Sequence, residues 1–276
     1  MGRLVDRHPG SRPQSGTGAR LKGVIALATA AGLAGFLGWS VERVLAGSWW
    51  GLLPLCAAGS LGLAARSLHD HVRPVLTALE GEDLPAARLA VARIVGRDVQ
   101  ALDASGVAAA ALESLAESLC DGVVAPLVWF LVAGLPGLFV YKAVNTADSL
   151  IGHIEAPYRE FGWAAARADD LMNLVPARLA GALIVLAAGR GWRTMLRDAR
   201  HHASPNAGWP EAAMAGALGV ELGGAATYDG VAHARPLFGQ GPRPGAADLA
   251  AGLSLYLRVC VVLALALLAG GLAWPR

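Results

Sequence analysis

Three long runs without a charged residue limit what this chain can fold into. They cover Gly23–Val41, Val44–Ala65 and Gly122–Tyr141. A helix needs about 20 apolar residues to cross the hydrocarbon core of a bilayer, and each run is about that long. Two further apolar stretches, each interrupted by one arginine, lie near Leu174–Gly189 and Leu249–Trp274. The sequence therefore predicts an all-α, polytopic integral membrane protein with four or five transmembrane helices and two sizeable helical cytoplasmic loops.

The overall composition supports a membrane protein and argues against other classes. Only 16% of residues are charged, 55% are hydrophobic, and the mean hydropathy is +0.47. A net charge of +2 gives no sign of the strongly basic face that nucleic-acid binding requires. The three cysteines, Cys56, Cys120 and Cys260, lie in or beside apolar segments without paired spacing. We expect small buried residues there, not a disulfide framework or a zinc site.

The charge distribution predicts how the chain is placed in the cell (inner) membrane. The first 22 residues carry five basic side chains and one acidic one, which favours a cytoplasmic N-terminus. The predicted division is a polar cytoplasmic leader (1–22), two transmembrane helices (23–65), a cytoplasmic helical segment (66–121), membrane segments enclosing the main polar motif (122–189), a cytoplasmic loop (190–248) and a C-terminal transmembrane helix (249–276).

This count of spans separates the polar blocks between the two sides of the membrane. It places residues 142–170 on the opposite side of the membrane from the two large loops. We expect either that the third apolar run is re-entrant, or that the polar residues after it line a cavity within the membrane that reaches the loops.

Three acidic residues recur at helical spacing just before the third apolar run. Glu113, Glu117 and Asp121 stand at i, i+4 and i+8 and would share one face of a helix. Like charges stacked in this way repel, so a cation or a basic partner is expected opposite them. One interpretation is a solvated helix face. The other is a site for Mg²⁺ or for a substrate amine.

The segment between Tyr141 and Arg178 concentrates polar side chains beside apolar sequence. Such groups are costly at a membrane boundary unless they pair or bind something polar, so the segment is interpreted as a site. Its second half, Phe161–Arg178, is expected to be one helix with Arg167 and Asp170 paired at i, i+3. The alternative is that this pair only ties the helix to its neighbours. The polar residues are Lys142, Asn145, Thr146, Asp148, Ser149, Arg159, Arg167, Asp169, Asp170, Asn173 and Arg178.

A turn and a short helix are expected after the fourth apolar stretch. Ser204-Pro205-Asn206 has turn chemistry, Trp209-Pro210-Glu211 would open a helix, and Gly219 would end it. A helix start next to Arg200 and His201 is a reasonable cradle for phosphate. An ordinary turn between helices is the alternative. The following Gly/Pro-rich segment, Tyr228–Pro244, is expected to have little regular structure. No common nucleotide or hydrolase signature is present in the sequence.

Several blocks, in order, resemble the adenosylcobinamide-phosphate synthase family of cobalamin biosynthesis (CobD/CbiB). Together they lie between residues 94 and 224, and several long blocks in order are more specific than one short motif. The blocks are IVGRDVQALD (94–103), ESLAESLCDGVVAP (113–126), YKAVNTADSLIGH (141–153), FGWAAARADDLMNLVPAR (161–178) and RDARHHASPNAGWPEAAMAGALGVELGG (197–224).

The resemblance implies a membrane-bound ligase. Family members join adenosylcobyric acid to (R)-1-amino-2-propanol or its O-phosphate, with ATP as co-substrate and Mg²⁺ as cofactor, and they make the amide that carries the nucleotide loop. An acyl phosphate is the expected intermediate, because a carboxylate does not react with an amine at neutral pH without a leaving group. The implied partners are these substrates, the lipid bilayer and other enzymes of the corrinoid pathway, with no nucleic acid.

Residue type and position suggest a role for each candidate in such a reaction. The metal candidates are Glu113, Glu117 and Asp121, with Asp148 as a fourth acid. The catalytic candidates are Lys142, Asp148, Asp169 and Asp170. The candidates for binding substrate or phosphate are Asn145, Thr146, Ser149, Arg159, Arg167, Asn173, Arg178, Arg200, His201, Ser204, Asn206, Trp209 and Glu211.

Two other functions compete with the ligase at this stage. A corrinoid transporter would be expected to carry polar groups inside several spans and an internal repeat, and the sequence shows neither. A non-catalytic membrane scaffold for pathway enzymes would have no need for dense blocks of carboxylate, amide and basic side chains.

Overall fold

The computed structural model describes residues 16–45, 49–152, 158–228 and 230–273. Most of the predicted leader, and His153 at the end of one block, lie outside this range. The helices are α1 (Gly16–Leu45), α2 (Leu52–Leu61), α3 (Ala65–Glu80), α4 (Leu84–Val91), α5 (Ala104–Leu119), α6 (Ala125–Ile151), α7 (Tyr158–Phe161), α8 (Trp163–Met172), α9 (Leu174–Ala188), α10 (Trp192–Asp198), α11 (Gly208–Leu218) and α12 (Ala246–Ala273). Short 3-10 turns cover Trp49–Gly51 and Ala199–His201, and a π-helical segment covers Cys120–Val124. The all-α prediction is confirmed.

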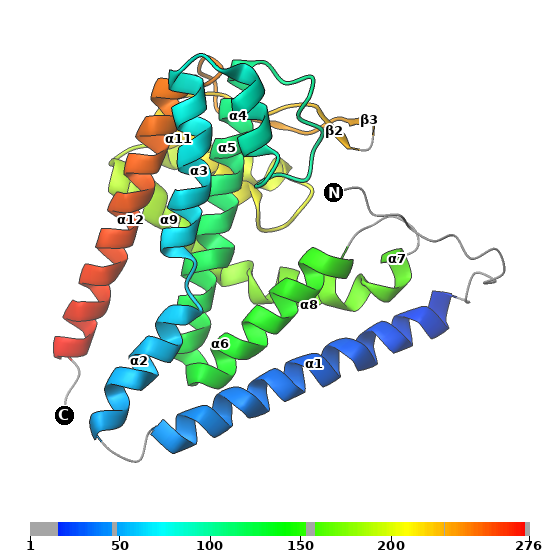
Figure 1. Cartoon of the computed structure of the whole chain (residues 1–276), viewed down its shortest axis with the longest axis vertical. Helices are drawn as coiled ribbons and strands as arrows, with labels where there is room; N and C mark the ends of the chain where they lie inside the picture. Colours follow the sequence, from blue (N-terminus) through cyan, green and yellow to red (C-terminus); the bar gives the residue numbers. More distant parts are fainter. Residues whose placement is uncertain (1–15, 46–48, 153–157, 229, 274–276) are drawn as a thin grey trace.

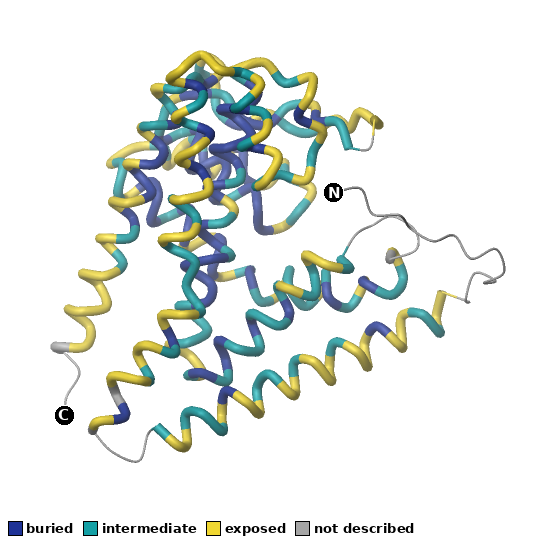
Figure 2. The backbone as a smooth tube through the Cα atoms, viewed as in Figure 1, coloured by how far each residue is buried: buried dark blue, intermediate teal, exposed yellow. Residues whose placement is uncertain are grey.

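Helix α5 is the centre of the folded body. Helices α3, α4, α11 and α12 pack around it (Figure 1). The side chain of Asp103 caps the helix by accepting a hydrogen bond from the N–H of Gly106 at 2.7 Å. Four consecutive alanines, 108–111, are all buried, and such small side chains let neighbouring helices approach closely. Figure 2 shows the buried residues gathered along this helix and its neighbours, with α1 and the lower half of α12 mostly exposed.

Four short strands lie between residues 222 and 238, and the last two of them lie within Tyr228–Pro244, which was expected to have little regular structure. Strand β1 (Leu222–Gly223) pairs antiparallel with β4 (Leu237–Phe238), and β2 (Ala226–Tyr228) pairs antiparallel with β3 (Val231–His233). The loop before α5 holds the second hairpin, because Asp98 donates its N–H to Thr227 O and accepts the N–H of Gly230, both at 2.8 Å.

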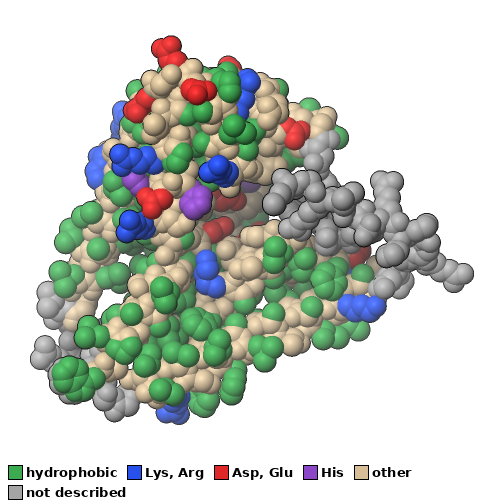
Figure 3. Space-filling view, viewed as in Figure 1, with side chains coloured by type: hydrophobic (Ala, Val, Ile, Leu, Met, Phe, Trp, Pro, Cys, Tyr) green, Lys and Arg blue, Asp and Glu red, His purple; other side chains and the backbone are tan. Residues whose placement is uncertain are grey.

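Among the residues that the structure describes, three helical stretches are long and apolar enough to cross a membrane, or four if the bent pair α8–α9 counts as one span. They are Gly16–Leu45, Ala104–Ile151 and Ala246–Gly271. Hydrophobic side chains cover the lower part of the molecule over α1, α2 and α6 (Figure 3). The fold therefore fits a multi-pass membrane protein. The predicted span Val44–Ala65 is not among the three or four, since α2, the longest described helix within that run, has ten residues.

The third apolar run reverses its direction within helix α6. Helix α6 is broken at Ala133 and Gly134, where Gly134 has φ 62° and ψ −153°, backbone angles that only glycine adopts readily. On the return, Tyr141 Oη donates to the carbonyl of Asp121 at 3.3 Å. Residues twenty apart in sequence therefore meet, as the two limbs of a hairpin do.

The uncharged part of the descending limb is short for a membrane. The descending limb, 122–132, rises about 16 Å at 1.5 Å per residue, roughly half of the hydrocarbon thickness. Leu131 and Val132 at its tip are exposed. Of the two arrangements expected from the sequence, the re-entrant one agrees with this geometry, and it removes the conflict over which side residues 142–170 face.

The tip of the hairpin is tied to α1. The N–H of Leu135, which begins the returning limb, donates to Glu42 Oε2 at 2.8 Å. A carboxylate at the first N–H groups of a helix satisfies donors that have no partner within the helix. Helix α1 then runs beside the returning limb (Figure 1).

The helix expected over Phe161–Arg178 is two helices. Helices α8 and α9 are bent by 48° at Asn173. Pro176 explains the break, because it has no N–H to donate to Met172 O and its ring would clash with that carbonyl in a continuous helix. The bend turns the Asn173 side chain into the interior, where only 2% of its surface is exposed.

Candidate functional site

One cavity of about 340 Å³ collects residues from every predicted polar block except the first. It lies where the end of α5, the returning limb of α6, the α8–α9 bend and the loop before α11 meet. In Figure 3 acidic side chains are visible in the hollow between the upper body and the lower arm. The polar residues that line it are Glu117, Cys120, Asp121, Asp148, Arg167, Asp169, Asp170, Asn173, Ser204 and Asn206.

Two amides hold the carboxylate of Asp169 at the cavity wall. Asn145 Nδ2 donates to Oδ1 at 3.1 Å, and Asn173 Nδ2 donates to Oδ2 at 3.0 Å. Asn173 is itself fixed, since its Oδ1 accepts from Tyr141 Oη at 3.2 Å. Each oxygen of Asp169 keeps a lone pair for a ligand, and its direction is set by α6 and by the α8–α9 bend together.

The acids in this cavity greatly outnumber the cations. Five carboxylates line it, and the one basic lining residue, Arg167, is paired with Asp170 at 3.1 Å. That pair was predicted from its i, i+3 spacing and is confirmed. Asp121 lies in the π-helical segment, a local widening that is frequent at functional sites. Such a cavity attracts metal ions and ammonium groups.

The five acids do not form a closed metal cage. Among the described residues, no three His, Cys, Asp or Glu side chains converge closely enough to hold a metal ion. Mg²⁺ fits this arrangement in its usual manner, through one or two carboxylates with water and substrate phosphate oxygens completing the shell.

The Ser204–Asn206 turn closes one wall of the cavity. Ser204 Oγ accepts the N–H groups of Asn206 and Ala207 at 3.2 and 3.3 Å, so these donors ahead of α11 already have a partner within the chain. Asn206 Nδ2 donates to Asp170 O at 2.7 Å and ties the turn to α8. The Arg178 guanidinium lies 4.8 Å from the centre of the Trp209 ring and covers one face of the indole.

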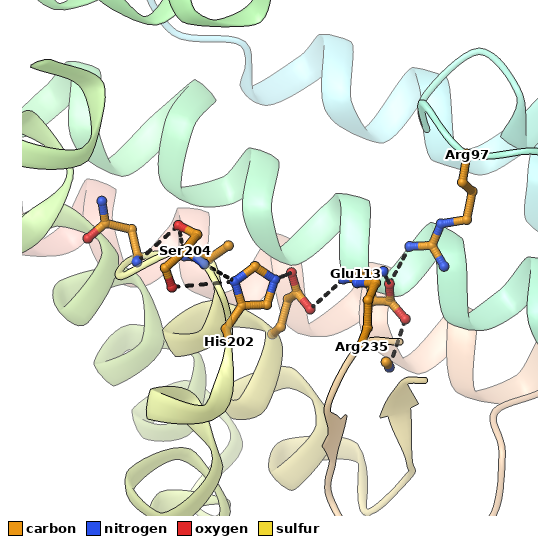
Figure 4. Close-up of polar contacts among 9 residues, drawn as sticks. Arg97, Glu113, His202, Ser204 and Arg235 are labelled. Carbon is orange, nitrogen blue, oxygen red and sulfur yellow. Dashed lines mark hydrogen bonds and ion pairs between the residues drawn. The ribbon is translucent and has the colours of Figure 1, made fainter. Parts of the chain in front are cut away.

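Glu113 lies apart from the other two acids of its row. Its carboxylate forms ion pairs with Arg97 and with Arg235, the latter at 2.9 Å, and accepts the N–H of Gly223 at 2.8 Å (Figure 4). The basic partner expected opposite the acidic row is therefore present. Arg235 also reaches Glu211 at 3.4 Å, and Glu211 lies 3.7 Å from His202 Nε2.

Burial and nearby charges shift the pKa values of Glu211, His202 and Arg235. Burial, with the negative charges of Glu113 and Glu117, raises the pKa of Glu211 well above its ordinary value. Burial and the positive charge of Arg235 lower the pKa of His202. Burial alone would lower the pKa of the Arg235 guanidinium, but the negative charges of Glu113 and Glu211 have the larger effect and raise that pKa. Both shifts favour the uncharged forms of the two side chains in the His202–Glu211 contact.

Several predicted residues do not line the main cavity. Lys142, Asn145 and Trp209 are partly buried. The exposed ones are Thr146, Ser149, Arg159, Arg178, Arg200 and His201. Glu113 and Glu211 line a second, smaller cavity. The sequence reasoning missed Arg97, Arg235 and Tyr141. Arg97 and Arg235 had a usable signal, because three stacked acids require basic partners.

Comparison with known proteins identifies the family. The family model described as CobD/Cbib protein matches residues 1–256. A cobalamin biosynthesis protein CobD of Rhodobacter capsulatus is 53% identical over 246 residues, covering 87% of this chain and 77% of the relative. A CobD of Geobacter metallireducens is 47% identical over 237 residues, covering 83% and 74%. No solved structure matches the chain. The chain thus belongs to the CobD/CbiB family and has a role in cobalamin biosynthesis.

Proposed function

We propose that this protein is an ATP-dependent amide ligase, an adenosylcobinamide-phosphate synthase. It joins a carboxylate of adenosylcobyric acid to (R)-1-amino-2-propanol O-phosphate or to the free amino alcohol. The observation that carries the proposal is the main cavity, where five carboxylates face one space beside the apolar hairpin of α6 and one of them, Asp169, is held by two amides.

The acid-rich cavity suits the two cationic species of such a reaction. Glu117, Asp121 and Asp148 are the proposed magnesium ligands, and Mg²⁺ would neutralise the negative charge of the ATP phosphates. Asp169 is the proposed acceptor for the ammonium group of the amine, since its oxygens are held in fixed directions by Asn145 and Asn173. A cavity of about 340 Å³ has no room for a corrin ring, so only the reacting side chain of that substrate would enter.

The proposed reaction proceeds in two steps. The substrate carboxylate attacks the terminal phosphorus of ATP, an O–P bond forms, and ADP leaves. The amine nitrogen then attacks the carbonyl carbon of the acyl phosphate, a C–N bond forms, phosphate leaves, and the amine gives its proton to a cavity carboxylate. Lys142, Arg159, Arg200 and His201 stay predictions as phosphate-binding residues.

An assay in detergent tests the proposal. Purified protein is given adenosylcobyric acid, aminopropanol phosphate and Mg-ATP, and the amide product is followed by mass spectrometry. We expect an ATP-dependent product with the wild type and with Asp70→Asn, an exposed acid on α3, and a loss of at least about 100-fold with Asp169→Asn. A folded wild type that forms no product would refute the ligase and favour the scaffold.

A further inference from the structure

Helix α12 carries an arginine in the middle of an apolar stretch. Its two charged residues are Asp248, which accepts the N–H of Gly245 at 2.9 Å near the start of the helix, and Arg258 near the middle. Arg258 is exposed, and within the described chain it forms no hydrogen bond or ion pair. The stretch Ala246–Gly271 is long and apolar enough to cross a membrane. A guanidinium in or beside the hydrocarbon region is costly without an anionic partner, so we expect Arg258 to meet an anion.

Arg258 lies beside a groove between α12 and the end of α9, which we name the α9–α12 groove. Its volume is about 320 Å³, and no acid of the described chain lines it. The apolar surface continues along α12, because the exposed Leu265 and Leu268 recur two helical turns after Arg258 and Val261. A cation at one end of an apolar strip matches the charge and shape of a phospholipid. The lining residues are Ala187, Leu257, Arg258, Val261 and Val262.

The level of Arg258 along α12 is where the folded body ends. Tyr256 Oη donates to Ala65 O at 2.7 Å, and the N–H of Ala64 donates to Gly122 O at 2.8 Å. The start of α3, the start of the hairpin's descending limb and the middle of α12 therefore lie at one level. Beyond this level α12 leaves the body and is mostly exposed (Figure 2). In a bilayer that takes up the hairpin and the lower half of α12, Arg258 would lie near the lipid phosphates.

We propose that the α9–α12 groove binds one anionic phospholipid, with its phosphate on Arg258 and an acyl chain along Val262 and Leu265. A guanidinium donates two parallel N–H groups to two phosphate oxygens, which orients the headgroup in a way that a point charge does not. The groove supplies a cation and no described carboxylate, so a lipid with a net negative charge is favoured over one whose headgroup also carries a cation. This site is separate from the main cavity and goes beyond the proposed ligase function.

Lipid binding to the purified protein tests this assignment without turnover. The whole chain in detergent is titrated with phosphatidylglycerol and with phosphatidylcholine of the same acyl chains, and bound lipid is counted by native mass spectrometry. Phosphatidylglycerol is expected to bind at least about fivefold more tightly, since one basic residue near a lipid surface contributes about that factor. Equal affinity for the two lipids would overturn the proposal, as would displacement of bound phosphatidylglycerol by an equal concentration of inorganic phosphate.

Variants locate the two contacts. Arg258→Gln is expected to remove the preference for phosphatidylglycerol, whereas Arg93→Gln, which changes an exposed arginine just after α4, keeps it. Val262→Trp, which fills the groove beside an intact Arg258, is expected to lose bound lipid of both kinds. An unchanged preference in Arg258→Gln, or unchanged binding in Val262→Trp, would refute the site. If Arg258 instead pairs with a carboxylate of a second copy of the chain, Arg258→Gln lowers the oligomeric mass and leaves the lipid affinities unchanged, which also refutes the proposal.

Discussion

Two glutamates one helical turn apart on α5 are expected to respond in opposite ways to the same substitution. Glu113→Gln removes the negative charge that pairs with Arg97 and Arg235, and it places an amide NH₂ where one oxygen accepted hydrogen bonds. Glu117→Gln removes a carboxylate that has no hydrogen-bond partner in the described chain. We therefore expect the first change to lower stability and the second to affect binding.

The magnitude for Glu113→Gln follows from its partners. The side chains of Arg97 and Arg235 are only 11% and 16% exposed, so water does not compensate for the lost carboxylate. Removing one partner of a buried ion pair costs about 3–5 kcal/mol. Arg235 keeps Glu211, which places the expected loss in the free energy of unfolding near the lower end, about 3 kcal/mol. Glu117→Gln is expected to cost less than about 0.5 kcal/mol.

Thermal unfolding in one detergent, followed by circular dichroism, measures both changes. For a chain of this size, about 3 kcal/mol corresponds to a decrease in Tm of roughly 6–12 °C. Glu117→Gln is the matched control and is expected to stay within about 2 °C of the wild type. If Glu113→Gln unfolds at the temperature of Glu117→Gln, the argument that Glu113 anchors a buried charge network is wrong.

Three further predictions concern pH and the hairpin tip. The raised pKa of Glu211 means that the folded protein keeps a proton that the unfolded chain releases, so this group contributes less stability as pH rises above about 4.5. The Tm of Glu211→Gln should therefore increase relative to that of the wild type between about pH 5 and about pH 9. A Tm difference that stays constant over this range would contradict the raised pKa. Burial alone would raise the pKa of Asp198, but hydrogen bonds, including that from the N–H of Gly239, hold it below its ordinary value. Asp198→Asn should thus cost about 1 kcal/mol at neutral pH, and the difference in denaturant midpoint should disappear as pH falls through that lowered pKa. Gly134→Ala should destabilise by at least about 1–3 kcal/mol, because its φ is 62° and a Cβ there would lie 2.3 Å from a Glu42 oxygen. Gly32→Ala, in open space on α1, should not destabilise, and equal Tm values for these two alanine variants would argue against the strained tip.

Local signals in the sequence predicted several elements because they act over a few residues. Gly219 ends α11 with φ 75°, as its place after a short Ala-rich stretch indicated. The reversal in α6 was not located from the sequence. An uncharged run about 20 residues long has the same composition whether it crosses a bilayer or turns back within it, and the useful clue was the pairing of Gly134 with Pro136 at its middle.

The site could be predicted only as a set of blocks. Its lining comes from segments near residues 117–121, 148–152, 166–177 and 203–210, and the sequence does not tell how the helices bring them together. Of the three acids at helical spacing, Glu113 and Glu117 lie on α5 and Asp121 lies just beyond its end. Glu113 is neutralised by arginines from two loops, and Asp121 lies one turn past Glu117 in a π-helical segment.

The turn in α6 determines how the chemistry meets the membrane. In a re-entrant arrangement the chain would leave the lipid on the side where it entered, so reactants and products of the proposed reaction would not need to cross the bilayer and the membrane potential would not act on them. The depth to which the apolar tip at Leu131 and Val132 enters the lipid would then set the distance between the cavity and the lipid headgroups. Lengthening the two limbs equally would change that height and leave the arrangement of the carboxylates intact.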